Sequence, residues 1–203
     1  MVNPWSDHEV KALFTNAKFT KPKNIAPLIL IAAYTGMRIE EICNLKVDDV
    51  IVSSFRVNAE KTKATGREVP IHSTIFDLVQ KLKNRSNDGY LIPGLSIGSY
   101  DSRSHSIGQK FSKMKKKMGF NSRQKCFHSF RHNVAIKLRE QGCDKTLIID
   151  LVGPVQGILV PNTYVNTAQT LSSGLYETKK NAMETITYDG LLGLAKEYTH
   201  SVQ

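Results

Sequence analysis

The chain has 203 residues, of which 40% are hydrophobic and 23% are charged, as is ordinary for a soluble globular protein. This length suffices for one sizeable core or two small ones, and no apolar run approaches the roughly 20 residues that a membrane span requires. The 28 Lys and Arg against 18 Asp and Glu give a net charge of +10, which favours a polyanionic partner such as a nucleic acid.

The N-terminal residues and the cysteines exclude further classes. The first residues lack the basic-then-apolar order of a signal peptide, so we expect a cytoplasmic protein. The three cysteines form neither a CxxC pair nor a cluster with histidines at zinc-binding spacing. We therefore expect reduced thiols and no bound metal.

The front of the chain predicts three helices. Ser6 and Glu9 have the spacing of a capping box, which predicts a helix that starts there. Residues 25–34 are almost all apolar and predict a buried helix, which Gly36 ends. Residues 38–45 predict a second amphipathic helix.

The middle of the chain predicts a β-hairpin followed by more helices. Residues 50–57 alternate as a strand does, a basic turn (KTKATG) follows, and residues 67–72 predict the second strand. The basic segment 110–117 carries its apolar residues on one stripe. Further helices are predicted at 74–82, 128–141, 145–152 and 175–187. The pattern indicates a mixed α+β domain that is mainly α-helical, with a small antiparallel sheet.

Two basic positions in the first half suggest phosphate chemistry. Arg38 comes just after the glycine turn, where its guanidinium can grip a phosphate through two parallel hydrogen bonds. The competing interpretation is a surface arginine paired with Glu41. Lys61 lies at the hairpin tip with Lys63 and Arg67 beside it, so it can reach into a DNA groove unless this basic turn is merely solvated.

Two positions in the second half add a proton carrier and a nucleophile. In HSFRH, His128 and Arg131 are three residues apart and share one face of the predicted helix. Tyr164 follows Pro161 in a polar segment, where a tyrosine can be an exposed nucleophile, although most such tyrosines pack or form hydrogen bonds.

In this order the residues resemble the catalytic domain of the tyrosine recombinase family, the phage-type integrases. AAYTGMRIEEICNLKVDDV is similar to the first arginine box, which implies Arg38 as a catalytic arginine and Glu41 as its supporting acid. EKTKATGREVPI is similar to the hairpin that carries the family's lysine, which the register puts at Lys61, with Lys63 as the fallback.

The second half completes the resemblance. HSFRHNVAIKL is similar to the His-x-x-Arg box, which implies His128 and Arg131. LVGPVQGILVPNTYVN is similar to the Gly-His box and the tyrosine that follows it, which implies Tyr164 as the nucleophile. The resemblance runs from about Trp5 to Thr187, and it implies the fold of the family's catalytic core, double-stranded DNA as the partner and no cofactor.

Pro154 departs from the family's pattern. It stands where the family usually has a histidine, sometimes a tryptophan, and a proline offers no hydrogen-bond donor. One transition-state contact should therefore be missing, and a comparable donor is worth about 3 kcal/mol. His132 or His105 can be considered as a substitute.

The resemblance also implies a mechanism. Arg38 and Arg131 neutralise the phosphate oxygens while Tyr164 attacks and leaves a 3′-phosphotyrosine link. His128 accepts the tyrosine's proton and Lys61 protonates the departing 5′ oxygen, so that neither a metal nor ATP is needed. We expect further DNA contacts from Lys63, Arg67, Lys113 and Lys116.

The implied organisation is a catalytic domain at 1–190 and a tail at 191–203, with the family's N-terminal core-binding domain absent. We expect the tail either to dock on a neighbouring copy or to fray. The family implies a homotetramer on paired recombination sites for the full protein, and we expect a monomer for this fragment. Three alternatives stay open: a DNA-binding relative impaired by Pro154, a DNA-relaxing enzyme like the type IB topoisomerases, and a basic RNA-binding or ribosomal protein.

Overall fold

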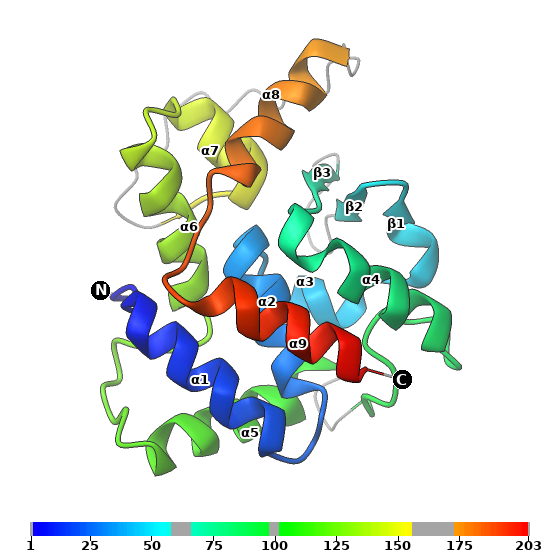
Figure 1. Cartoon of the computed structure of the whole chain (residues 1–203), viewed down its shortest axis with the longest axis vertical. Coiled ribbons are helices and arrows are strands. Elements are labelled where there is room, and N and C mark those ends of the chain that lie inside the picture. Colours follow the sequence, from blue (N-terminus) through cyan, green and yellow to red (C-terminus); the bar gives the residue numbers. More distant parts are fainter. Residues whose placement is uncertain (1, 58–65, 98–101, 156–172, 203) are drawn as a thin grey trace.

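The structure is a computed structural model that describes residues 2–57, 66–97, 102–155 and 173–202 (Figure 1). In chain order the elements are α1 (Asp7–Phe19), α2 (Ile25–Thr35), α3 (Ile39–Asn44), a 3-10 turn (Val47–Asp49), β1 (Val50–Ile51), β2 (Ser54–Val57), β3 (Arg67–Pro70), α4 (Ser73–Arg85), α5 (Ser104–Lys117), α6 (Ser129–Glu140), α7 (Lys145–Val152), α8 (Ser173–Glu184) and α9 (Leu191–Ser201). The described part is thus mainly helical with one small antiparallel sheet, which confirms the predicted fold class.

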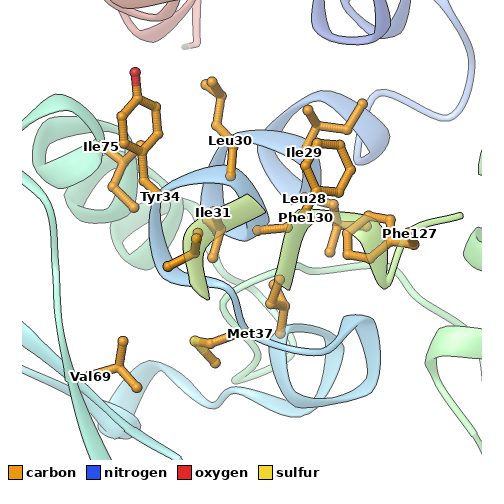
Figure 2. Close-up of a cluster of buried hydrophobic side chains, with 14 of the residues drawn as sticks. Leu28, Ile29, Leu30, Ile31, Tyr34, Met37, Val69, Ile75, Phe127 and Phe130 are labelled. Carbon is orange, nitrogen blue, oxygen red and sulfur yellow. The ribbon is translucent and has the colours of Figure 1, made fainter. Parts of the chain in front are cut away.

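Helix α2 forms the centre of the core, and every one of its residues is buried. It packs against α1, α3, α4 and α6, so a continuous apolar segment is what this position requires. Figure 2 shows this core, to which α2 contributes Leu28, Ile31 and Tyr34 and α6 contributes Phe130. The prediction of a buried helix at this place is confirmed.

Helix α1 begins with the capping box that the sequence predicts. The backbone N–H of Glu9 donates to Ser6 Oγ at 3.2 Å, and the backbone N–H of Ser6 donates to Glu9 Oε2 at 2.7 Å. The helix then buries Val10, Leu13 and Phe14 against the core. The predicted capping box and the helix that starts from it are therefore confirmed.

The sheet corrects one prediction. Residues 50–57 do not form a single strand, because the chain turns at Val52, which has a φ of 44° and is 85% exposed. The resulting β1–β2 hairpin pairs Val50 with Phe55, and the sheet order is β1-β2-β3. The second, predicted hairpin is confirmed, since β2 pairs antiparallel with β3 and Val57 lies opposite Arg67.

The helix predictions hold better in their centres than at their ends. Helix α7 has the predicted bounds, whereas α5 begins at Ser104, well before the basic segment 110–117. Helix α8 ends at Glu184 rather than at residue 187. None of the helices within 2–57, 66–97, 102–155 and 173–202 is long and apolar enough to cross a membrane.

The C-terminal residues form α9, which packs on α1 and α4 of the same chain. Leu191, Ala195 and Thr199 are buried in this contact, and Lys81 Nζ caps the helix end by donating to the carbonyls of Thr199 at 2.9 Å and Val202 at 3.1 Å. The expectation of a frayed tail is therefore wrong. Docking of the same residues on a neighbouring copy stays a prediction.

Candidate active site

Arg38 lies at the N-terminus of α3, directly after the turn that ends α2. Gly36 makes this turn with a φ of 65°, and Arg38 follows in an extended conformation. Its backbone N–H donates to Glu41 Oε2 at 2.7 Å, and its Nη1 lies 3.0 Å from Glu41 Oε1. The Arg38 side chain is still 42% exposed, so this guanidinium is both oriented and accessible.

Arg131 approaches the same carboxylate from α6. Its side chain is 1% exposed, and its Nη1 donates to the Gly36 carbonyl at 3.2 Å and lies 3.8 Å from Glu41 Oε2. Its Nη2 makes a long contact, 3.5 Å, with the Pro154 carbonyl. A Cβ at Gly153 would lie 2.3 Å from that nitrogen, and Gly153 has a φ of 78°, so only glycine fits here.

Arg67 completes what we call the arginine cluster: Arg38, Arg67 and Arg131 around Glu41. The Arg67 guanidinium pairs with both Glu41 oxygens, at 2.9 and 2.8 Å. Burial would raise the pKa of Glu41, but the hydrogen bonds and charge of Arg67, the charge of Arg131 and the Arg38 backbone N–H lower it to about 2. Three guanidinium groups share one carboxylate, so the site keeps an excess of positive charge.

His128 lies at the start of α6, one helical turn from His132. The two ring centroids are 5.5 Å apart and the rings meet edge to face. Burial, and then the charge of Arg131, lower the pKa of His128 to about 4, so the imidazole is neutral at physiological pH. His132 is 7% exposed, and its Nε2 has no hydrogen-bond partner among the described residues.

Helix α5 packs against α3, the helix that Arg38 precedes. A Cβ at Gly108 would lie 3.6 Å from Ile39 Cδ1, so α5 contacts α3 at the residue that follows Arg38. Lys113 and Lys116 are exposed on α5. They line an open hollow together with Ser104, His105, Gly108, Gln109 and Ser112. We call Lys113 and Lys116 the lysine face.

The structure thus joins Arg38, Glu41, His128 and Arg131, with the backbone of Pro154 beside them. Pro154 itself is exposed and brings no side-chain donor. Lys61, Lys63 and Tyr164 lie outside the described residues. Within the described part of the chain, His, Cys, Asp and Glu nowhere gather in a group of three or more that could hold a metal ion.

Comparison with known proteins bears on this arrangement. A model of the phage integrase family matches residues 5–170. The chain belongs to the phage integrase family. The family that the sequence resembles is thereby confirmed.

Known family members support the fold. Tyrosine recombinase XerA of Pyrococcus horikoshii is 30% identical over 156 residues, 73% of this chain and 51% of the relative. A solved integrase from mycobacterium phage Brujita has a TM-score of 0.63 at 18% identity, covering 95% of this chain and 63% of that one. A crystal structure of a lambda integrase tetramer bound to a Holliday junction gives 0.60 at 18% identity, covering 79% and 49%. The chain spans about half the length of the curated relatives it matches.

Sequence reasoning missed how Arg67 is placed within this family fold. We expected a DNA contact at the hairpin, whereas the Arg67 side chain turns toward Glu41 and the end of α7. It also missed the Gly36 carbonyl as an acceptor for Arg131. Neither contact has a local sequence signal, because each joins residues from separate elements.

Proposed function

We propose that this chain is the catalytic domain of a site-specific DNA recombinase that cleaves and rejoins strands through a 3′-phosphotyrosine at Tyr164. The observation that carries the proposal is the pairing of Arg38 and Arg131. These residues come from α3 and α6, yet their guanidinium nitrogens lie 3.0 and 3.8 Å from the two oxygens of one carboxylate. Two guanidinium groups held so close suit the two non-bridging oxygens of a phosphodiester.

The electrostatics of the cluster favour an anionic ligand. Burial, and then the charges of Arg38 and Arg67, lower the pKa of Arg131 to about 9, because the guanidinium has lost its water and lies among other positive charges. The Nε of Arg131 is buried and has no hydrogen-bond partner among the described residues, whereas such groups are nearly always paired. A bound phosphate would relieve both deficits. Because Arg131 is 1% exposed, the phosphate reaches it only when the covering atoms move.

Proton transfer is assigned to His128 and Lys61. His128 is neutral at physiological pH and can therefore accept the proton of the attacking Tyr164. Its low pKa makes it a weak base without DNA, but a phosphate anion beside it would raise that pKa and strengthen it. Lys61 would protonate the leaving 5′ oxygen. The tyrosine–phosphate bond conserves the energy of the broken bond, so a 5′ hydroxyl can reverse the step without ATP or a metal.

The wider interaction is with double-stranded DNA. The lysine face is exposed on α5, which packs against α3, so it can follow the phosphate backbone away from the cleaved bond. Since lambda integrase forms a tetramer on a Holliday junction, we extend that assembly on paired sites to the full protein. The tail at 191–203 would then exchange its contact on α1 and α4 for one on a neighbour, and the reaction would take place with the DNA in the host cytoplasm.

Trapping of a covalent adduct tests the proposal. The 203-residue chain is incubated with a duplex library that carries a nick a few nucleotides 3′ of a randomised stretch, so that the short cleaved fragment diffuses away. We expect a denaturant-resistant protein–DNA adduct, which Tyr164→Phe abolishes while DNA binding is kept. Tyr176→Phe is the control, because Tyr176 forms a hydrogen bond with Ser53 away from the cluster. If the adduct persisted in Tyr164→Phe, the assignment of Tyr164 as the nucleophile would be wrong.

Pro154 supports a second candidate, a DNA-binding relative with impaired catalysis. Its side chain offers no donor, while its carbonyl lies 3.5 Å from Arg131 Nη2, so a histidine here would stand next to the cluster. If the missing donor limits the reaction, Pro154→His should raise the cleavage rate by about 100-fold, the equivalent of about 3 kcal/mol. An unchanged rate, in a chain that forms the adduct, would show that the proline is tolerated and would remove this candidate.

A further inference from the structure

Arg67 lies where three elements of the candidate site meet. It is the first residue of β3, its Nε donates to the Leu151 carbonyl in α7 at 3.1 Å, and its two terminal nitrogens donate to Glu41 in α3 at 2.9 and 2.8 Å. Its side chain is 19% exposed. A guanidinium bound on both edges in this way has a fixed plane, which no lysine in its place can reproduce.

This contact decides how Glu41 is shared. Oε1 accepts from Arg38 Nη1 at 3.0 Å and from Arg67, and Oε2 accepts from the Arg38 backbone and from Arg67 while Arg131 stays at 3.8 Å. Arg67 therefore forms a two-bond pair with the Glu41 carboxylate, with one terminal nitrogen on each oxygen. The guanidinium of each of the other two arginines meets only one oxygen and keeps a terminal nitrogen, Nη2, that is not paired with Glu41.

Removal of Arg67 would change that division. The Glu41 carboxylate would lose its strongest partner and could turn to form a two-bond pair with Arg38 or Arg131. Such a pair would compete with a phosphate for the same donors and would cancel the positive charge that the phosphate needs. A carboxylate near a phosphate site is tolerable only if it is held away from the donors that the phosphate uses.

We propose that Arg67 is a positioning residue that holds the Glu41 carboxylate in place and so keeps Arg38 and Arg131 available to the scissile phosphate. This inference rests on the proposed function. It differs from the DNA contact that the sequence suggested for Arg67, because here Arg67 acts on the reaction through Glu41. A positioning role predicts that the effect of replacing Arg67 depends on whether Glu41 is present. A DNA contact predicts that the two replacements act independently, so the two roles can be separated.

A double-mutant cycle on the cleavage step separates them. Adduct formation is measured in single turnovers at saturating DNA for the wild type, Arg67→Gln, Glu41→Gln and the double variant, with DNA affinity measured in parallel. Arg67→Gln should slow cleavage by roughly 10- to 100-fold, the size expected for a misplaced catalytic group. In the Glu41→Gln background, where no carboxylate competes, Arg67→Gln should reduce the cleavage rate by a factor that is at least about fivefold smaller. Arg56→Gln is the matched control, because it removes one charge from an exposed position on the neighbouring strand β2.

The pH profile gives a readout that loss of folding alone would not move. Arg67 is among the groups that hold the pKa of Glu41 near 2, so its removal should raise that pKa. The acid limb of the cleavage rate should then shift to higher pH in Arg67→Gln and less in Arg67→Lys, and Arg56→Gln should leave it in place. Thermal melts set a temperature at which every variant is folded.

The outcomes are distinct. Losses that shrink in the Glu41→Gln background, with a shifted acid limb, support the inference. The inference is overturned if the losses in rate of the two single variants multiply, within about twofold, to give that of the double variant. It is also overturned if the losses appear only in DNA affinity, and in either case Arg67 is left as a DNA contact. If the wild-type chain forms no adduct at all, the proposed function fails and this inference falls with it.

Discussion

The arginine cluster and the lysine face of α5 are both cationic, yet their surroundings differ. In the cluster, Glu41 binds Arg38 and Arg67 at 3.0 Å or less and lies 3.8 Å from Arg131. Lys113 and Lys116 instead stand exposed along an open hollow. Charge that is buried and fixed by a counter-ion is suited to hold one phosphate in one geometry. Exposed lysines give attraction with little geometry.

The difference predicts that each region controls a separate quantity. Variants of the cluster should change the rate of the chemical step and the stability of the fold, whereas variants of the lysine face should change DNA affinity and its salt dependence. A variant of one region that changed both the cleavage rate and the DNA affinity by similar factors would weaken this division.

The largest effect is expected from Arg38→Ala. This change removes an accessible guanidinium that is aligned on the site, so the single-turnover cleavage rate should fall roughly 100- to 1,000-fold. DNA affinity should fall only a few-fold, because many phosphate contacts remain. The division would fail if the loss lay in affinity and saturating DNA restored the rate.

The pH dependence of stability should come next. The folded-state pKa of Glu41, about 2, lies below its ordinary 4.5, so its contribution is complete above about pH 4.5 and is lost as the pH falls toward 2. The loss should reach roughly 3 kcal/mol in the free energy of unfolding. Urea denaturation between pH 6 and 2.5 measures it, and Glu41→Gln should lack this part of the slope. An identical slope in both proteins would contradict the assigned pKa.

Gly153→Ala should lower stability by a smaller amount. The added Cβ would lie 2.3 Å from Arg131 Nη2, and the backbone has a φ of 78°. Gly142→Ala is the matched control, because Gly142 has a φ of 79° and open space around it. Chemical denaturation should show a loss of about 1–2 kcal/mol for the control and at least about 1 kcal/mol more for Gly153→Ala. Equal losses would mean that Arg131 moves aside without cost.

The smallest effect on chemistry is expected from the lysine face. Lys113→Gln and Lys116→Gln should each reduce the slope of log affinity against log salt by about 1 and leave the cleavage rate at saturating DNA unchanged. Lys196→Gln on α9 serves as the control, since Lys196 is exposed on a helix that packs on α1 and α4. If all three variants kept the wild-type slope, the lysine face would not be part of the DNA contact.

Local signals in the sequence predicted local structure well. The capping box at Ser6 and Glu9, the buried helix α2 and the bounds of α7 depend on neighbours within one or two turns, and each was confirmed. The turn at Val52 was missed because a β-branched residue with positive φ is rare and the strand pattern runs through it.

Which residue types gather around Glu41 was predictable from the sequence, and their contacts were less so. The spacing of His128 and Arg131 predicted that the two would lie close together, and the charge of Arg131 does act on His128. The family resemblance grouped them with Arg38. The inward turn of Arg67 depends on the register of β3 and the position of α7, and the packing of α9 depends on its contact with α1 and α4. Such long-range contacts leave no periodic trace in the sequence.

The most direct test of the central claim is to map the residue that becomes linked to DNA. The chain contains seven tyrosines, so proteolysis of the trapped adduct followed by mass spectrometry of the nucleotide-bearing peptide distinguishes among them. We predict a single linked peptide that carries the nucleotide on Tyr164, formed by the wild type and by Tyr176→Phe alike. A nucleotide on any other residue, or no linked peptide at any salt concentration that supports DNA binding, would contradict the account.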